Sequence, residues 1–182
     1  MSSTTLSIYK RRSMRFIFVF VVLLSSVPIS AQTNVSQIQK EIDKTVWKPF
    51  QKAFETLNGT ALNSTYADEV LRVTPDGIDT KNEFKTANLN RFLKNKTDAA
   101  TITLDFWFDS RHTNETTSYE VGFYRIGTSY YGKEPHYNYG QFHIVIKKIN
   151  GHWKITQDWD TARINGNSIT SEDFQKQEPL KF

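Results

Sequence analysis

The hydrophobic pattern of this chain changes its period partway along, and this change constrains the fold more than any other feature. Apolar residues recur every three or four positions over residues 38–57 and again over 82–94, which predicts two amphipathic helices. Pro49 lies inside the first helix and is expected to kink it. From Ala99 onward apolar and polar residues alternate, which is typical of β-strands with one buried face. Helices followed by a run of strands favour an α+β fold, with the helices packed on one face of the sheet.

Residues that favour turns separate the strand segments. Pro75-Asp76-Gly77 follows a short strand, and Asn150-Gly151 is a two-residue sequence typical of a β-hairpin. The strands are expected at 69–74, 101–111, 117–129, 139–149 and 152–160. The last four of them form an antiparallel meander, and no regular element is expected after Thr161.

The first 31 residues have the three-part layout of a secretory signal peptide. Basic residues within positions 10–15 precede the apolar run Phe16–Leu24, and small residues then lead to a predicted cleavage site after Ala31. The same layout holds if translation starts at Met14. The run is much shorter than the roughly 20 residues that a membrane-spanning helix needs, so no stable membrane anchor is expected after cleavage. We therefore expect an exported protein, either periplasmic or secreted.

The excess positive charge of the chain lies in that leader. The full sequence has 23 Lys and Arg against 19 Asp and Glu, and removal of residues 1–31 leaves 19 of each sign. A neutral chain lacks the clustered basic residues that bind phosphate backbones, so no nucleic-acid partner is expected. The sequence has no cysteine, which excludes a disulfide scaffold and a cysteine-ligated metal site.

The order of elements and several short motifs resemble the nuclear transport factor 2-like (NTF2-like) superfamily. A long helix precedes Tyr66-Ala67-Asp68, the Pro-Asp-Gly turn, a second helix and the meander. The hairpin 149–155 is similar to the closing Gly-x-Trp-x-Ile hairpin of small SnoaL-like and DUF4440-like members. The resemblance implies a cone-shaped α+β fold, in which N-terminal helices pack on a curved, mainly antiparallel sheet with a pocket between them. The expected division is a signal peptide (1–31), an NTF2-like domain (32–162) and a C-terminal tail (163–182).

The Asn150-Gly151 turn predicts the register of the last two strands. A two-residue loop pairs Ile149 with His152 and Ile146 with Ile155, and further out it pairs Ile144 with Gln157 and Phe142 with Trp159. For the preceding hairpin, the turn at 113–116 places Tyr119 and Arg125 on the buried side. A buried polar group must find a partner or line a wet cavity. The predicted ligand-binding residues are Tyr66, Tyr119, Arg125, Gln157 and Trp159.

The same register places one acid/base pair on the opposite face of the sheet. His143 is expected to face Asp158, and a carboxylate beside an imidazole can orient it as a general base. A hydrogen bond at the surface or at a dimer interface is the alternative for this pair.

Two further groups are predicted on that opposite face. An acidic cluster either binds a cation or is simply solvated, and its members are Asp105, Asp109 and Glu120. Trp107 and Tyr124 would leave apolar surface exposed on a monomer, which favours a homodimer packed sheet to sheet.

The residues leave several functions open. No metal-ligand spacing, nucleophile motif or phosphate-binding loop is present, so no metal and no cofactor are expected. The favoured hypothesis is an exported domain that binds a small, partly apolar ligand between helices and sheet without catalysis. The alternative is an isomerase, dehydratase or hydrolase that uses a carboxylate or a histidine as general base. A purely structural dimer is the third hypothesis.

Overall fold

The computed structural model describes residues 28–182, with side chains from Asn34 onward, and Val35–Phe182 form one compact unit. The predicted signal peptide lies almost wholly outside the described residues, so cleavage and export stay predictions. Within the described range, no helix has the length and apolarity needed to cross a membrane.

Helices cover one face of the sheet, and a π-helical turn interrupts the first of them. The helical elements are α1 (Pro28–Ile42), the π-helical turn η1 (Asp43–Trp47), α2 (Lys48–Glu55), α3 (Gly59–Ser64) and α4 (Glu83–Thr97). In the π-helical turn, the Lys48 N–H donates to the carbonyl of Asp43, five residues back. Pro49 follows directly and has no N–H to donate. The irregularity predicted at Pro49 is therefore taken up in the turn before it.

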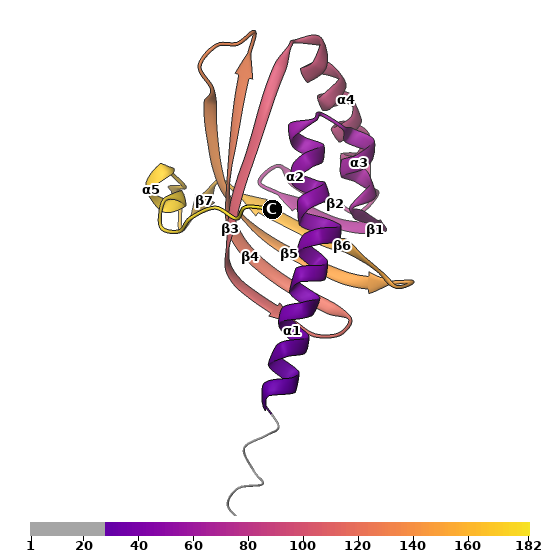
Figure 1. Ribbon diagram of the computed structural model, residues 1–182. Coiled ribbons are helices and arrows are strands. Elements are labelled where there is room, and N and C mark those ends of the chain that lie inside the picture. Colours follow the sequence, from indigo (N-terminus) through magenta and orange to yellow (C-terminus); the bar gives the residue numbers. More distant parts are fainter. Residues whose placement is uncertain (1–27) are drawn as a thin grey trace, which may run out of the picture. The chain divides into compact units, whose positions relative to one another are not determined.

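Six strands form one curved sheet, and the α+β fold predicted from the change of period is confirmed. The strands are β1 (Tyr66–Thr74), β2 (Gly77–Asp79), β3 (Ala100–Thr113), β4 (Thr117–Tyr130), β5 (His136–Ile149) and β6 (His152–Thr161). Their order is β2-β1-β6-β5-β4-β3, and every neighbouring pair is antiparallel except β1 with β6. Figure 1 shows α2, α3 and α4 on one side of this sheet and the short helix α5 on the other.

Aromatic side chains fill much of the space between helices and sheet. Trp47 is 3% exposed and contacts Phe50 from its own helix and Phe106, Phe108 and Phe142 from the sheet, with ring centroids 5.1–5.8 Å apart. Each such pair contributes about 0.5–1.5 kcal/mol beyond its buried area. The helices are thus held on the sheet mainly by aromatic packing.

A β-bulge in β6 changes which residues face the helices. The pairs Ile149–His152 and Ile146–Ile155 form as predicted, but Val145 then pairs with Gln157, so Thr156 is an extra residue. An extra residue reverses the side on which every later side chain lies. Asp158 therefore faces the helices beside Ile144, and the predicted pairs Ile144–Gln157 and Phe142–Trp159 are wrong.

A second bulge has the same effect on β3 and β4. Phe108 pairs with Gly122 and Ser110 with Val121, so Asp109 is the extra residue. A side chain at Gly122 would place its Cβ 2.2 Å from the Trp107 carbonyl oxygen and 2.5 Å from the Phe142 ring, so only glycine fits opposite this bulge. The predicted faces of β4 are thereby exchanged.

The C-terminal segment covers the outer face of the sheet, although the sequence predicts no regular element there. It contains β7 (Arg163–Ile164), β8 (Asn167–Ser168) and α5 (Ser171–Phe174). The Trp107 indole stacks on Phe123 at 4.7 Å between centroids and donates to the Phe174 carbonyl oxygen at 2.8 Å. Tyr124 faces the helices instead. The prediction that Trp107 and Tyr124 form an exposed apolar surface is therefore wrong, because the tail covers Trp107. Dimerisation itself stays a prediction.

Candidate functional site

A cavity of about 140 Å³ lies between the helices and the sheet. Aromatic and aliphatic side chains from η1, α2, α3, α4 and the sheet form most of its wall; these are Trp47, Phe50, Phe54, Leu62, Phe84, Leu104, Phe106, Ile126, Phe142 and Ile144. Tyr124 joins this wall because its ring lies over Gly140 on the neighbouring strand, where a Cβ atom would be 2.3 Å from the ring. An apolar cavity of about 150 Å³ accommodates one benzene ring.

Four polar residues form a connected network on one side of the cavity. Arg72 of β1 donates to Asp158 Oδ1 at 2.7 Å and also to Asp160, and the two aspartates are two residues apart on β6. The Tyr66 hydroxyl donates to Asp158 Oδ2 at 2.7 Å. Both oxygens of Asp158 are therefore occupied by donors, whereas Asp160 uses only Oδ2 in hydrogen bonds to the described residues.

Burial dominates the electrostatics of this network. Burial raises the pKa of Asp158, while Arg72 and the Tyr66 hydroxyl oppose that rise. Burial and the neighbouring Asp158 raise the pKa of Tyr66, so its hydroxyl remains a donor at neutral pH. Burial also raises the pKa of Tyr124 to about 12. The cavity thus combines apolar walls with phenol groups that stay protonated and a carboxyl whose pKa is raised by burial.

The mouth of the cavity lies between α4 and the β1–β2 hairpin. Arg72, Phe84, Asn88 and Arg91 line both the cavity and an adjoining surface groove, which reaches Asp79 on β2. Arg91 is exposed, and its guanidinium carbon lies 5.3 Å from the Phe54 ring centroid and 4.9 Å from that of Phe92. A ligand that enters here passes the exposed Arg91 and the ion-paired Arg72.

Of the five predicted ligand-binding residues, the structure places only Tyr66 in the cavity wall. The other four are Tyr119, Arg125, Gln157 and Trp159, and they lie on the outer face because the two bulges reverse the predicted register. Arg125 instead pairs with Asp105, with its Nη2 at 2.7 Å from Oδ2.

The predicted acid/base pair of His143 and Asp158 does not form. His143 pairs with Trp159 across the strands, with ring centroids 4.5 Å apart, and its Nδ1 lies 2.6 Å from the Tyr119 hydroxyl. Asp158 lies on the other face of the sheet. The prediction fails because Thr156 adds one residue between the hairpin turn and Asp158.

The predicted acidic cluster is also dispersed. Asp105 is paired with Arg125, Asp109 occupies the bulge, and Glu120 faces the helices, fully buried. Glu120 there accepts from Trp47 Nε1 at 2.6 Å, from Ser118 at 2.8 Å and from Arg111 at 3.0 Å, which ties the π-helical turn to β3 and β4. This carboxylate therefore holds helix and sheet together.

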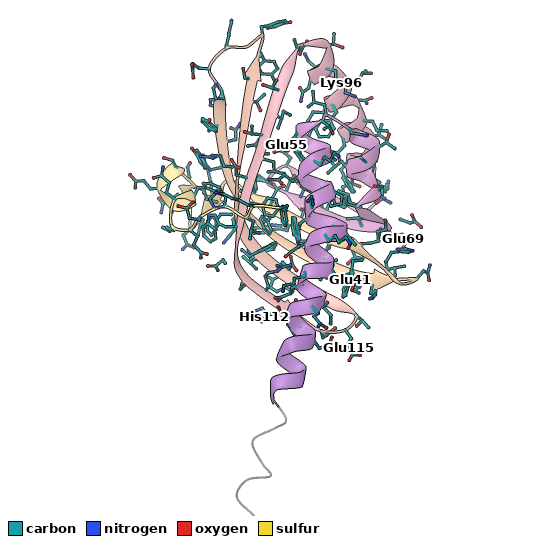
Figure 2. All side chains as sticks on the ribbon, in the orientation of Figure 1. Glu41, Glu55, Glu69, Lys96, His112 and Glu115 are labelled. Carbon is teal, nitrogen blue, oxygen red and sulfur yellow. The ribbon has the colours of Figure 1, made fainter. Side chains whose placement is uncertain are left out.

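The described part of the chain has no group of three or more His, Asp or Glu side chains placed to hold a metal ion. Figure 2 shows His112 and Glu115 near the β3–β4 turn, toward the opposite end of the molecule from Lys96 of α4. The two residues are therefore neighbours at a hairpin turn.

Most of the polar network was not predicted from the sequence. Arg72, Asp160, Asn88 and Arg91 were not identified as site residues, and Asp158 was placed on the wrong face. One signal was available: in a strand, Asp158 and Asp160 share a face because side chains alternate. Two carboxylates on one face require a nearby cation if that face is buried, and Arg72 supplies it.

Comparison with solved structures shows that the chain has the NTF2-like fold. A conserved protein from Planctomyces limnophilus is 19% identical, with a TM-score of 0.59 over 69% of this chain and 96% of its own. An NTF2-like protein with a cystatin-like fold from Novosphingobium aromaticivorans is 8% identical, with a TM-score of 0.59 over 80% and 94%. An NTF2-like protein from Streptomyces avermitilis, provisionally assigned as a dehydratase, is 14% identical, with a TM-score of 0.53 over 73% and 98%. No protein-family model and no curated protein sequence matches the chain.

Proposed function

We infer that this protein, which has the NTF2-like fold, binds a small and partly apolar molecule in the cavity between its helices and sheet. The main support for this inference is that one cavity combines an aromatic wall with a polar network on one side, formed by Arg72, Asp158, Asp160 and Tyr66. Ligand sites typically have this composition, because apolar walls supply affinity and a few fixed polar groups supply orientation. The cavity volume suits a ligand about the size of one aromatic ring.

Binding is expected to be measurable with 2-phenylethanol and p-cresol as probes. Each carries one aromatic ring and one hydroxyl, which can contact the polar side of the cavity. We expect saturable quenching or enhancement of tryptophan fluorescence, since Trp47 lines the cavity, and a rise in the melting temperature with probe concentration.

A cavity-filling substitution tests whether the probes bind at this place. Ile126→Phe adds volume to the cavity wall, and we expect it to lower the affinity for 2-phenylethanol at least about tenfold, which corresponds to roughly 1.4 kcal/mol. Ile149→Phe is the matched control, because Ile149 is exposed at the β5–β6 turn and lies outside the cavity wall. Equal affinities of both variants and the unsubstituted protein would place the binding elsewhere and contradict the proposal.

A second candidate function is proton transfer by Asp160. Asp160 lines the cavity and has one carboxylate oxygen without a hydrogen-bond donor among the described residues, whereas Asp158 has none to spare. A general base needs such a free oxygen within reach of the substrate. The enzyme alternative requires a carboxylate or histidine in the cavity, and the carboxylates are there. The provisional dehydratase assignment of the Streptomyces avermitilis protein is compatible with this candidate.

Hydrogen exchange at an acidic carbon distinguishes the two functions. Phenylacetaldehyde carries one aromatic ring, which the cavity can accommodate, and it has exchangeable α-protons. NMR in deuterated water measures their exchange. A proton-transfer enzyme should accelerate the exchange, and Asp160→Asn should reduce that acceleration by about 10²-fold or more while 2-phenylethanol still binds. Exchange at the uncatalysed rate with the unsubstituted protein would leave ligand binding as the function.

A further inference from the structure

Arg91 at the mouth of the cavity is a cation with no anionic partner among the residues that the structure describes. It belongs to α4, and its guanidinium lies over the Phe54 and Phe92 rings, both of which are buried. Among residues 34–182 no carboxylate forms an ion pair with it; its Nη2 donates only to Asn88 Oδ1, at 3.2 Å. The other arginine of the cavity, Arg72, is occupied by Asp158 and Asp160.

The position of Arg91 links the cavity to solvent. It lines both the cavity and the surface groove at the mouth, and its side chain is exposed. Stacking on two rings restricts the guanidinium, so it loses less freedom when it binds a ligand. Although the residue is exposed at the groove, the protein around it partly desolvates the guanidinium and lowers its pKa, and an anion placed beside it would offset that cost.

We propose that the ligand of this cavity is a small aromatic carboxylate, with its ring against the aromatic wall and its carboxylate on Arg91. This inference rests on the proposed function and adds the chemical class of the ligand. A guanidinium matches a carboxylate because both are planar and two parallel hydrogen bonds can join them. The cavity volume limits the apolar part to about one ring.

The charges nearby favour a monoanion over the other classes of ligand. The two carboxylate groups of Asp158 and Asp160 share one cation, Arg72. A phosphate dianion in the cavity would therefore be repelled more strongly than a carboxylate monoanion. A cationic ligand would have to pass Arg91 and then compete with Arg72 for the same two carboxylates. A carboxylate at the mouth meets the unpaired Arg91. The groove there is also lined by Asp76 and by Asp79, whose oxygens already accept from the N–H groups of Lys81 and Phe84.

The test compares phenylacetate with 2-phenylethanol, which has a similar shape and no charge. Calorimetric titration of the purified protein should show phenylacetate binding about tenfold more tightly at low salt, with the advantage decreasing as ionic strength rises. Arg91→Met keeps an apolar stem over the Phe rings and removes the charge. It should lower phenylacetate affinity about tenfold and change 2-phenylethanol affinity less than about twofold.

Two further variants test whether the effect of Arg91→Met comes from a nonspecific loss of charge or from an altered fold. Lys94→Met lies on the same helix, removes the same charge and is outside the cavity wall, so it should leave phenylacetate affinity within about twofold. Arg91→Gln repeats the charge removal with a polar side chain, in case the methionine variant alters the fold.

Each outcome bears on one of the two proposals. If 2-phenylethanol binds as tightly as phenylacetate and Arg91→Met changes neither affinity, the carboxylate ligand is wrong, and the cavity still binds a neutral ligand. If neither compound binds, or if both bind and Ile126→Phe weakens neither, the proposed function fails and this inference fails with it. Tighter binding of phenylacetate that both Arg91 variants abolish supports the proposal.

Discussion

Replacing Arg72 with methionine is expected to reduce the free energy of unfolding by about 3–5 kcal/mol. Arg72 is the cation that faces Asp158 and Asp160, and its side chain is 19% exposed, against 7% for that of Asp158. Breaking a buried ion pair leaves an uncompensated charge in a medium of low polarity, which costs more than the lost hydrogen bonds. Urea unfolding at pH 7.5, followed by tryptophan fluorescence, measures the loss.

The loss should depend on pH in a defined direction. Burial already raises the pKa of Asp158, and removal of Arg72 takes away the main group that opposes the rise. A carboxyl whose pKa is higher in the folded protein than in the unfolded chain stabilises the fold when the pH is below its pKa in the unfolded chain, near 3.9. That stabilisation is lost as the pH rises through its pKa in the folded protein. The deficit of Arg72→Met should therefore be largest at neutral pH and shrink as the pH is lowered and Asp158 takes up a proton.

The double variant Arg72→Met with Asp158→Asn is the control for this prediction. It removes both members of the buried pair, and Asp160, whose side chain is 24% exposed, can be solvated. We expect it to recover most of the stability lost by Arg72→Met, because removal of a whole buried pair is often nearly neutral. A loss below about 1 kcal/mol for the single variant, with no pH dependence, would show that the network does not stabilise the fold.

Phe174→Ala is expected to cost about 3–5 kcal/mol, although it lies in a segment where the sequence predicts no regular element. The Phe174 side chain is 3% exposed, and its carbonyl oxygen accepts from the buried Trp107 indole. Truncation of the ring leaves a cavity beneath α5 and loosens the cover over Trp107 and Phe123. Thermal unfolding and the fluorescence of Trp107 should both report the change.

Phe182→Ala provides a matched control in the same tail. Phe182 is 39% exposed and contacts the Phe106 ring at 5.7 Å between centroids, so its truncation should cost less than about 1 kcal/mol. Similar losses for the two variants would contradict the assignment of α5 as the part of the tail that covers the sheet. Self-association of Phe174→Ala, measured by sedimentation, would show that the uncovered Trp107 surface is adhesive.

The element types were predictable because they depend on local patterns. Apolar residues recur every three or four positions over residues 38–57 and every second position after Ala99. Helices form in the first segment and strands in the second. The Asn150-Gly151 turn fixed the pairs next to it, Ile149 with His152 and Ile146 with Ile155, since a two-residue loop leaves one register. The resemblance to the NTF2-like superfamily, drawn from the order of these elements, agrees with the fold found by structural comparison.

The site was less predictable because it depends on single-residue irregularities. Thr156 and Asp109 carry no marker that distinguishes a bulge from a regular strand position, and each reverses the faces of the residues that follow. As a result Tyr119, Arg125, Gln157 and Trp159 were predicted inside and lie outside, whereas Asp158 lies inside. Only Tyr66 was correctly placed. It pairs with Ile155, before Thr156 on β6 and before the register shift on β1.

By itself, the sequence determined the α+β class, the order and types of the long helices and strands, and the neutral charge of the chain after residue 31, because these follow from composition and short-range periodicity. The tertiary structure alone decided which side chains share the cavity. Arg72 meets Asp158 through the parallel pairing of β1 with β6, Arg91 reaches the mouth through the packing of α4, and the tail covers Trp107. Such contacts join residues 37–86 positions apart, so no local pattern encodes them.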